Sequence, residues 1–148
     1  MLSEPGVVDA NVLVYAANAD AGEHAISRAL LEAARDPAVT LYVTSQIICE
    51  FYSVITNPRR VATPCSASEA LTMVAGILGL PGIHVLPVPA RALAGLMELL
   101  RRCPVTGGEV FDLQLVATMQ ANNVSHIYTF NAEDFTVFPE LVVVVPSA

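Results

Sequence analysis

Short apolar runs alternate with longer amphipathic segments along the 148 residues of this chain. Runs of branched and aromatic residues bounded by turn formers predict strands at Val7 and Val8 and at 41–44, 83–88, 126–130 and 141–145. Apolar positions at helical spacing predict helices at 22–37, 46–57, 66–80, 90–103 and 109–123. The first strand opens a segment that ends near Asn18, and residues 131–135 are interpreted as a loop or a short helical turn.

Polar and proline residues mark the predicted helix boundaries. Ser45 is predicted to cap the helix at 46–57, which Pro58 ends. Ser66 or Ser68 is predicted to cap the next helix, and Pro89 suits the first turn of the helix at 90–103.

This alternation of strands and helices predicts an α/β fold. Strands that are separated by helices form βαβ crossovers, and such crossovers build parallel sheets. We therefore expect a single domain over residues 1–148, with a three-layer α/β/α architecture and a small, mainly parallel sheet of four or five strands. In open sheets of this kind, binding sites lie at the carboxyl ends of the strands.

The chain is 54% hydrophobic and only 14% charged, with a mean hydropathy of +0.57. We still expect no membrane span, because prolines interrupt the longest uncharged stretch, 70–90. The N-terminal MLSEPG has no basic run, so a signal peptide is not expected. The three cysteines are scattered, which favours small buried thiols in a reducing cytoplasm over a disulfide framework or a zinc site.

The charge balance excludes several classes of protein. The net charge is −7, and all seven basic residues are arginine. Without lysine there is no Schiff-base, P-loop or kinase lysine. An acidic chain also lacks the basic face of a non-specific nucleic-acid coat, although a nuclease that holds cations among its acids remains compatible with it.

Four acidic residues stand among apolar neighbours, namely Asp9, Glu50, Asp112 and Asp134. An unpaired carboxylate is costly to bury. Asp134 has an alternative interpretation as a cap of the turn at 131–135. Glu50 and Asp112 are not expected at helix starts, and neither has an arginine at the three- or four-residue spacing of a helical ion pair. Carboxylates that converge at a sheet edge repel one another, so a divalent cation is their natural partner.

Four segments of the chain resemble the PIN-domain family, and within it the VapC-type toxins of prokaryotic toxin–antitoxin pairs: VVDANVLVYAAN, ICEFYSVI, VFDLQLVATMQANNVSHIYT and FNAEDF. The resemblance covers essentially the whole chain. It rests on the order and spacing of the acids and on the ending T-x-N-x-x-D-F at 129–135.

The resemblance implies an endoribonuclease that depends on Mg²⁺ or Mn²⁺. Asp9, Glu50 and Asp112 would form the core acidic triad, and Asp134 would be a fourth acid that varies more in the family. Many relatives carry a basic or histidine residue just before the third acid, whereas this chain has Gly-Glu-Val-Phe there. Glu109, one helical turn before Asp112, could join the acidic cluster.

The resemblance also implies supporting residues. Asn11 would support Asp9, and Thr129 and Asn131 would shape the loop that carries Asp134. Independently of the resemblance, Arg59-Arg60 and Arg101-Arg102 are the only paired basic residues. They are candidates for RNA phosphate contacts, with a solvated or helix-ending role as the alternative, and Arg59 and Arg60 are the expected pair.

The implied partners are an RNA substrate, a cognate antitoxin and a second copy of the chain in a homodimer. Apolar helix surface at 45–57 and 66–80 is the expected site of association, because the hydrophobic content exceeds what one small core absorbs. Two alternatives stay open from the residues alone. One is a non-catalytic module of the same fold that binds protein or RNA. The other is a nuclease that acts on structured DNA, although no basic arch for a duplex is evident.

Overall fold

A computed structural model describes residues 4–148 and contains one sheet of five short strands. The strands are β1 (Gly6–Val8), β2 (Leu41–Val43), β3 (Ile83–Val85), β4 (His126–Tyr128) and β5 (Val142–Val144). Every neighbouring pair is parallel, in the order β3-β2-β1-β4-β5. The predicted parallel α/β fold is therefore confirmed, with strands shorter than the sequence pattern indicated.

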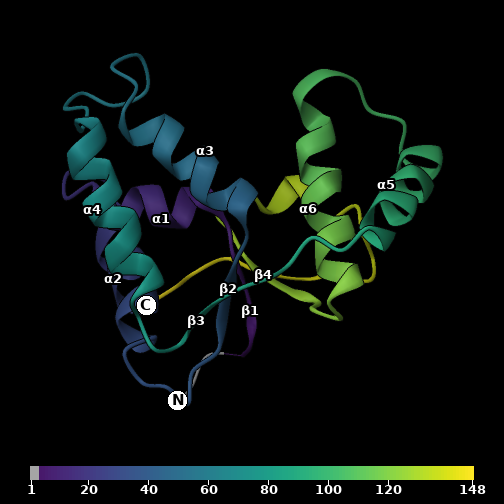
Figure 1. The fold of residues 1–148 in the computed structure, drawn as a ribbon, viewed down its shortest axis with the longest axis horizontal. Coiled ribbons are helices and arrows are strands. Elements are labelled where there is room, and N and C mark those ends of the chain that lie inside the picture. The colour runs from purple at the N-terminus through teal and green to yellow at the C-terminus, as the bar shows by residue number, and fades with distance from the viewer. Residues whose placement is uncertain (1–3) are drawn as a thin grey trace.

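Helices cover both faces of this sheet, as expected for a three-layer fold. The α-helices are α1 (Ala10–Ala17), α2 (His24–Ala33), α3 (Ser45–Ile55), α4 (Ala67–Leu78), α5 (Arg91–Arg102) and α6 (Val110–Ala121). The 3₁₀ turn η1 (Gly107–Glu109) precedes α6. A second 3₁₀ turn, η2 (Ala132–Asp134), follows β4. Helices α1–α4 lie on one side of the sheet, and α5 and α6 lie on the other (Figure 1).

Side-chain caps explain where three of these helices begin. The Asp9 carboxylate accepts a hydrogen bond from the Ala10 amide, so helix α1 starts directly after β1. Thr44, not Ser45 as predicted, caps α3, because its hydroxyl accepts from the Ile47 amide at 3.1 Å. Ser66 and Glu69 form a reciprocal capping box at the start of α4.

The structure corrects further expectations. The segment after β1 contains helix α1, which the sequence pattern did not separate from the strand. Asp112 lies in the first turn of α6, although it was not expected at a helix start, because η1 takes up the residues just before Val110. The cysteines are not buried thiols, since Cys49 is exposed and the other two are partly exposed.

The core lies between the sheet and its two layers of helices. Val7 and Val8 on the central strand are fully buried, one toward each face. Phe51 of α3 and Phe135 beyond η2 are the largest fully buried side chains, and they anchor two elements that carry acidic residues. Within residues 4–148, no helix has the length and hydropathy needed to cross a bilayer.

Candidate active site

The candidate site lies at the carboxyl ends of the central strands β1 and β4. The chain builds the sheet outward from β1 through β2 and β3, and then returns to place β4 on the other side of β1. This reversal is the topological switch point at which open α/β sheets bind ligands. Asp9 directly follows β1 and Thr129 directly follows β4, so the first polar residues at the switch point come from opposite ends of the sequence.

A hydrogen-bond network holds the Asp9 carboxylate in place. Its Oδ1 accepts from the Ala10 amide, and its Oδ2 accepts from the Thr129 hydroxyl, both at 2.8 Å. The Asn11 side-chain Nδ2 also donates to Oδ2, at 3.2 Å, and the Asn11 side-chain oxygen Oδ1 accepts from the backbone amide of Phe130. The Asn131 amide in turn donates to the Thr129 hydroxyl at 3.0 Å. The start of α1 and the loop that follows β4 are therefore tied to each other through Asp9 and Asn11.

Four acidic side chains line one cavity of about 480 Å³ at this switch point. Asp9 stands at its base after β1, and Glu50 comes from the middle of α3. Asp112 comes from the first turn of α6, and Asp134 ends η2. Figure 1 shows α3 and α6 on opposite sides of the short turn η2, so the acids approach from three directions. The structure thus brings together all four acids that the sequence singled out.

Burial and mutual repulsion raise the pKa of two of these acids. Desolvation is the largest cause of the pKa of about 6 for Asp112, and the charges of Asp134, Asp9, Glu50 and Glu109 raise it further. Desolvation also raises the pKa of Asp9, although the hydrogen bonds from Thr129 and Ala10 offset part of this rise. No ion pair within residues 4–148 includes any of the four acids that line the cavity. No arginine among the described residues therefore pairs directly with these acids, although Arg60 lines the same cavity.

The chemistry of these donors fits a hard divalent cation. Carboxylate oxygens are the ligands that Mg²⁺ and Mn²⁺ prefer. Within residues 4–148, no group of three or more His, Cys, Asp or Glu side chains is arranged so that it could enclose a metal ion. Mg²⁺ does not need such a cage, because it keeps several waters and binds through one or two carboxylates together with substrate phosphates. A cavity of about 480 Å³ leaves room for those waters.

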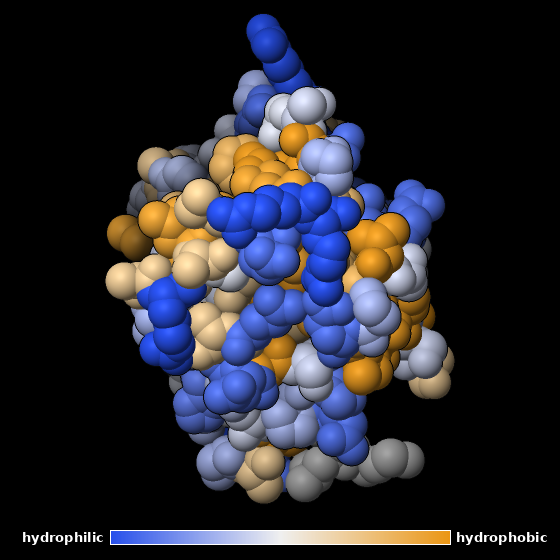
Figure 2. All heavy atoms as spheres, turned by 90° about the vertical axis from the view of Figure 1, so that its right-hand side faces the viewer, coloured by the Kyte–Doolittle hydropathy of each residue, from blue (hydrophilic) through white to orange (hydrophobic). Residues whose placement is uncertain are grey.

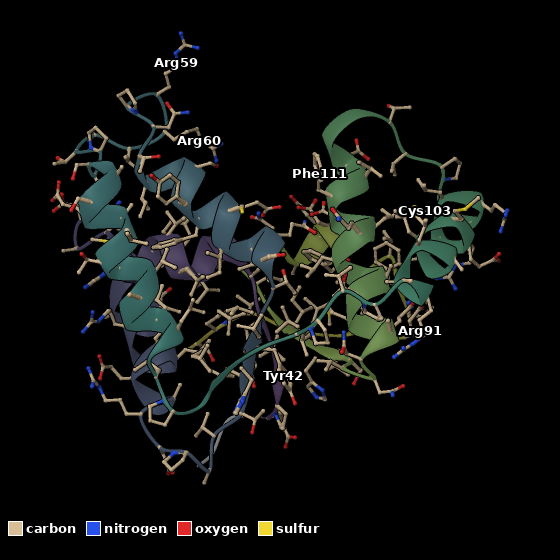
Figure 3. The ribbon with its side chains drawn as sticks, in the orientation of Figure 1. Tyr42, Arg59, Arg60, Arg91, Cys103 and Phe111 are labelled. Carbon is tan, nitrogen blue, oxygen red and sulfur yellow. The ribbon has the colours of Figure 1, made fainter. Side chains whose placement is uncertain are left out.

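The structure separates the two adjacent arginines that the sequence paired. Arg60 lines the cavity, whereas Arg59 does not. Figure 3 shows Arg59 extending away from the body of the molecule, while Arg60 lies beside α3. Neither guanidinium forms an ion pair within residues 4–148.

Sequence reasoning missed several polar residues in and beside this site, and three of them line the cavity: Tyr15, Asn18 and Ser53. Gln46, one helical turn before Glu50, donates a hydrogen bond to the Glu50 carboxylate. Its spacing of four residues from an acid inside a helix was the available signal. Glu109 does not line the cavity, although its charge contributes to the raised pKa of Asp112.

Comparisons with a family model and with curated proteins agree on the family to which this chain is similar. The family model for the PIN domain matches residues 6–141. Ribonuclease VapC43 of Mycobacterium tuberculosis is 33% identical over 116 residues, which cover 78% of this chain and 79% of the relative. VapC ribonuclease Mb2897 of Mycobacterium bovis matches equally well, with the same identity and the same coverage.

Solved structures share the fold over nearly the whole chain. VapC20 of M. tuberculosis, described as a sarcin–ricin loop cleaving toxin, superposes with a TM-score of 0.70 at 20% identity and covers 97% of this chain and all of its own. VapBC2 from Rickettsia felis, solved bound to a DNA fragment from its promoter, gives a TM-score of 0.67 at 18% identity, with the same coverage. At these identities the structures support the fold, whereas the family model and the curated relatives support the family. The chain belongs to the PIN-domain family and is a homologue of the VapC ribonucleases.

Proposed function

We propose that this chain is the ribonuclease toxin of a type II toxin–antitoxin pair and that it hydrolyses RNA phosphodiester bonds in the cytoplasm with Mg²⁺ or Mn²⁺. The observation that carries the proposal is the convergence of Asp9, Glu50, Asp112 and Asp134 on one cavity. A purely structural role does not explain four acids that form no ion pair within residues 4–148, since burial destabilises the charged forms of Asp9 and Asp112.

These four acids are the proposed carboxylate donors of the site, and a cation would bind through one or two of them together with waters and RNA phosphate oxygens. The cation would supply positive charge for the phosphodiester and acidify an attacking water. Asp9 is the fixed member, because hydrogen bonds to both of its oxygens prevent the carboxylate from rotating. Asp112, with a pKa of about 6, holds a proton more readily than an ordinary aspartate and releases it when positive charge enters the cavity. No histidine or cysteine is among the described residues that line the cavity, so the chain offers no nucleophile of these types there.

The proposal is tested by incubating the wild-type protein with a panel of defined RNAs in Mn²⁺ and in chelator. We expect internal cleavage in Mn²⁺ and none in chelator. Binding of RNA without cleavage under both conditions would instead favour a non-catalytic binding module.

Arg60 is proposed to contact an RNA phosphate near the scissile bond. Replacing Arg60 with Gln should raise KM for RNA by about five- to tenfold, because one charge-assisted hydrogen bond contributes roughly 1–2 kcal/mol. Arg59→Gln is the matched control, since Arg59 is the adjacent arginine but points away from the cavity. Steady-state cleavage of one short RNA by both variants gives the comparison. Equal changes in KM for the two variants would show that the chain attracts RNA only through its general charge.

The proposed protein partners are a cognate antitoxin and a second copy of this chain. Solved structures that share the fold include VapBC-1 from nontypeable Haemophilus influenzae and a toxin–antitoxin complex from Klebsiella pneumoniae. Apolar side chains reach the surface on α4, where Leu71 is 65% exposed. They also reach it on the side of α5 and α6, where Figure 2 shows apolar and hydrophilic side chains interspersed.

We assign the antitoxin to a cavity of about 380 Å³ among helices α1 to α4. Its apolar lining comes from these helices and the turn after α4: Leu13, Leu31, Phe51, Met73, Ile77 and Leu80. The cavity includes residues of α3 and α4, which lie within the two segments, 45–57 and 66–80, that were expected to mediate association. The occupant is proposed to be an apolar segment of the antitoxin.

Met73→Glu should weaken antitoxin binding by at least about tenfold, because it places a charge on apolar contact area. Leu93→Glu is the matched control, since Leu93 is an exposed apolar residue on α5, in the other helix layer. Titration of each toxin variant with the product of the neighbouring small reading frame measures the affinity. A strictly monomeric wild type at tens of micromolar to which that product does not bind would contradict the proposed partners.

A further inference from the structure

The side chain of Gln46 bridges two helices and contacts Glu50, which lines the acidic cavity. Gln46 lies in the first turn of α3, and its side-chain nitrogen Nε2 has two hydrogens to donate. One hydrogen bond reaches Glu50 Oε1 at 3.0 Å, one turn along the same helix. The other reaches the backbone carbonyl of Phe111 at 2.9 Å, 65 residues further along the chain. Both partners only accept hydrogen bonds, so Nε2, rather than the amide oxygen, must face them.

This bridge joins elements that otherwise pack elsewhere. Helix α3 packs mainly on α1 and α4, whereas α6 packs on α5. Phe111 immediately precedes Asp112 in the first turn of α6. A single side chain therefore connects Glu50 with the backbone that positions Asp112.

The carboxylate of Glu50 needs such a restraint more than Asp9 does. Asp9 has a short side chain held by the protein on both oxygens. Glu50 has an additional rotatable bond and faces three other acids across the cavity, so repulsion favours conformations that turn it toward solvent. The hydrogen bond from Gln46 holds Oε1 of Glu50 in place, and Oε2 takes no part in this hydrogen bond.

We propose that Gln46 is a positioning residue, which holds the Glu50 carboxylate and the first turn of α6 in the relative placement that lets Glu50 and Asp112 act on the same cation. This inference rests on the proposed function, because it takes the four acids as cation ligands. It adds a residue that touches neither RNA nor the reacting atoms and acts through Glu50 and Asp112.

The test compares Gln46→Met with the wild type. Methionine has nearly the length and volume of glutamine but no hydrogen to donate. Gln120→Met is the matched control, because Gln120 also donates to a carboxylate, that of Glu140 at 2.9 Å, but Glu140, unlike Glu50, does not line the cavity. Mn²⁺ affinity is measured by calorimetry on metal-free protein, and stability is measured by thermal melting in chelator.

We expect Gln46→Met to bind Mn²⁺ about tenfold more weakly, which is the usual loss when the hydrogen-bond partner of a metal ligand is removed. Gln120→Met should bind Mn²⁺ like the wild type. Both variants should melt only slightly below the wild type, because Gln46→Met loses two hydrogen bonds and Gln120→Met loses one, and all three are exposed or only partly buried. RNA cleavage by Gln46→Met should fall at low Mn²⁺ and recover as Mn²⁺ is raised, while KM for RNA stays unchanged.

Unchanged Mn²⁺ affinity in Gln46→Met would overturn the proposal, whatever its melting temperature, because the bridge would then serve only the fold. An equal loss of affinity in Gln120→Met would also overturn it, because the effect would not be specific to the site. A wild type that binds Mn²⁺ but cleaves no RNA would instead overturn the proposed function, and the affinities would still decide the role of Gln46.

Discussion

Asp9→Asn should lower RNA cleavage at least about a hundredfold at saturating Mn²⁺, because it replaces a proposed cation ligand with a neutral amide. Asparagine caps helices as well as aspartate does, so α1 should keep its start and the protein its fold. Glu50→Gln and Asp112→Asn should cause losses of similar size. Asp134→Asn should cost less, because Asp134 ends an exposed turn and no hydrogen bond to its carboxylate holds it among the described residues.

The control for these variants is Asp36→Asn. The Asp36 carboxylate also accepts a backbone hydrogen bond, from the Ala38 amide at 2.9 Å, but Asp36 is exposed and lies outside the cavity. Its variant should cleave RNA at the wild-type rate. Initial rates on a single RNA, measured across a Mn²⁺ series, separate a loss of cation affinity from a loss of turnover. Near wild-type cleavage by Asp112→Asn at saturating Mn²⁺ would rule out the assignment of these acids.

The second large effect concerns stability, since Asp112→Asn should raise the melting temperature of the metal-free protein at neutral pH. A folded-state pKa of about 6, against 3.8 in the unfolded chain, means that the charged form is destabilised by folding. The difference corresponds to about 3 kcal/mol at most. Asp112 is only partly buried, so solvent screening reduces it to about 1–1.5 kcal/mol, or roughly 3–6 °C in Tm. The favourable position of Asp112 in the first turn of α6 contributes less, about 0.3–1 kcal/mol.

The sign of the pH dependence follows from the direction of the shift. Below about pH 4, Asp112 is protonated in both states and the variant should have no advantage. The wild type should lose stability relative to the variant as the pH rises from about 4 to 6, and the full difference should remain above that range. The raised pKa of Asp9 also lowers the stability of the folded state as the pH rises, in the wild type and in Asp112→Asn alike.

In Mn²⁺ the wild type should instead melt above Asp112→Asn. A cation that binds only the folded state stabilises it by RT ln(1 + [L]/Kd), and the variant binds the cation less well. Melting curves of the wild type, Asp112→Asn and Asp36→Asn, recorded in chelator and in Mn²⁺ at two pH values, provide the measurement. If Asp112→Asn melts below the wild type in chelator and Mn²⁺ moves neither curve, the four acids have a structural role.

Much of the fold could be predicted because its boundaries are local. Each long helix after α1 ends near a proline, a glycine or an asparagine that the sequence displays, and Asn123 adopts the left-handed conformation (φ 56°) expected beyond α6. Helix α1 was not predicted because its Val- and Tyr-containing sequence is also typical of a strand. Its start depends on the side chain of Asp9, which carries both the cap and a proposed ligand.

The candidate site was predictable as a set of acids but not as an arrangement. The sequence indicated Asp9, Glu50 and Asp112 because an unpaired carboxylate among apolar neighbours is costly to bury. Arg59 and Arg60 are chemically identical and adjacent, so only the path of the loop after α3 distinguishes them. The role of Gln46 depends on a carbonyl 65 residues away, which no local pattern reveals.

The hydrogen bond between Asp9 and Thr129 spans 120 residues of sequence, and this separation affects when the enzyme can first become active during synthesis. The central strand β1 leaves the ribosome well before β4. Pairing over such distances is slow, because the chain must close a long loop before the contact stabilises it. A nascent chain therefore carries Asp9 and Glu50 before Thr129 and Asp134, so the site on a translating ribosome stays incomplete until β4 and η2 have emerged.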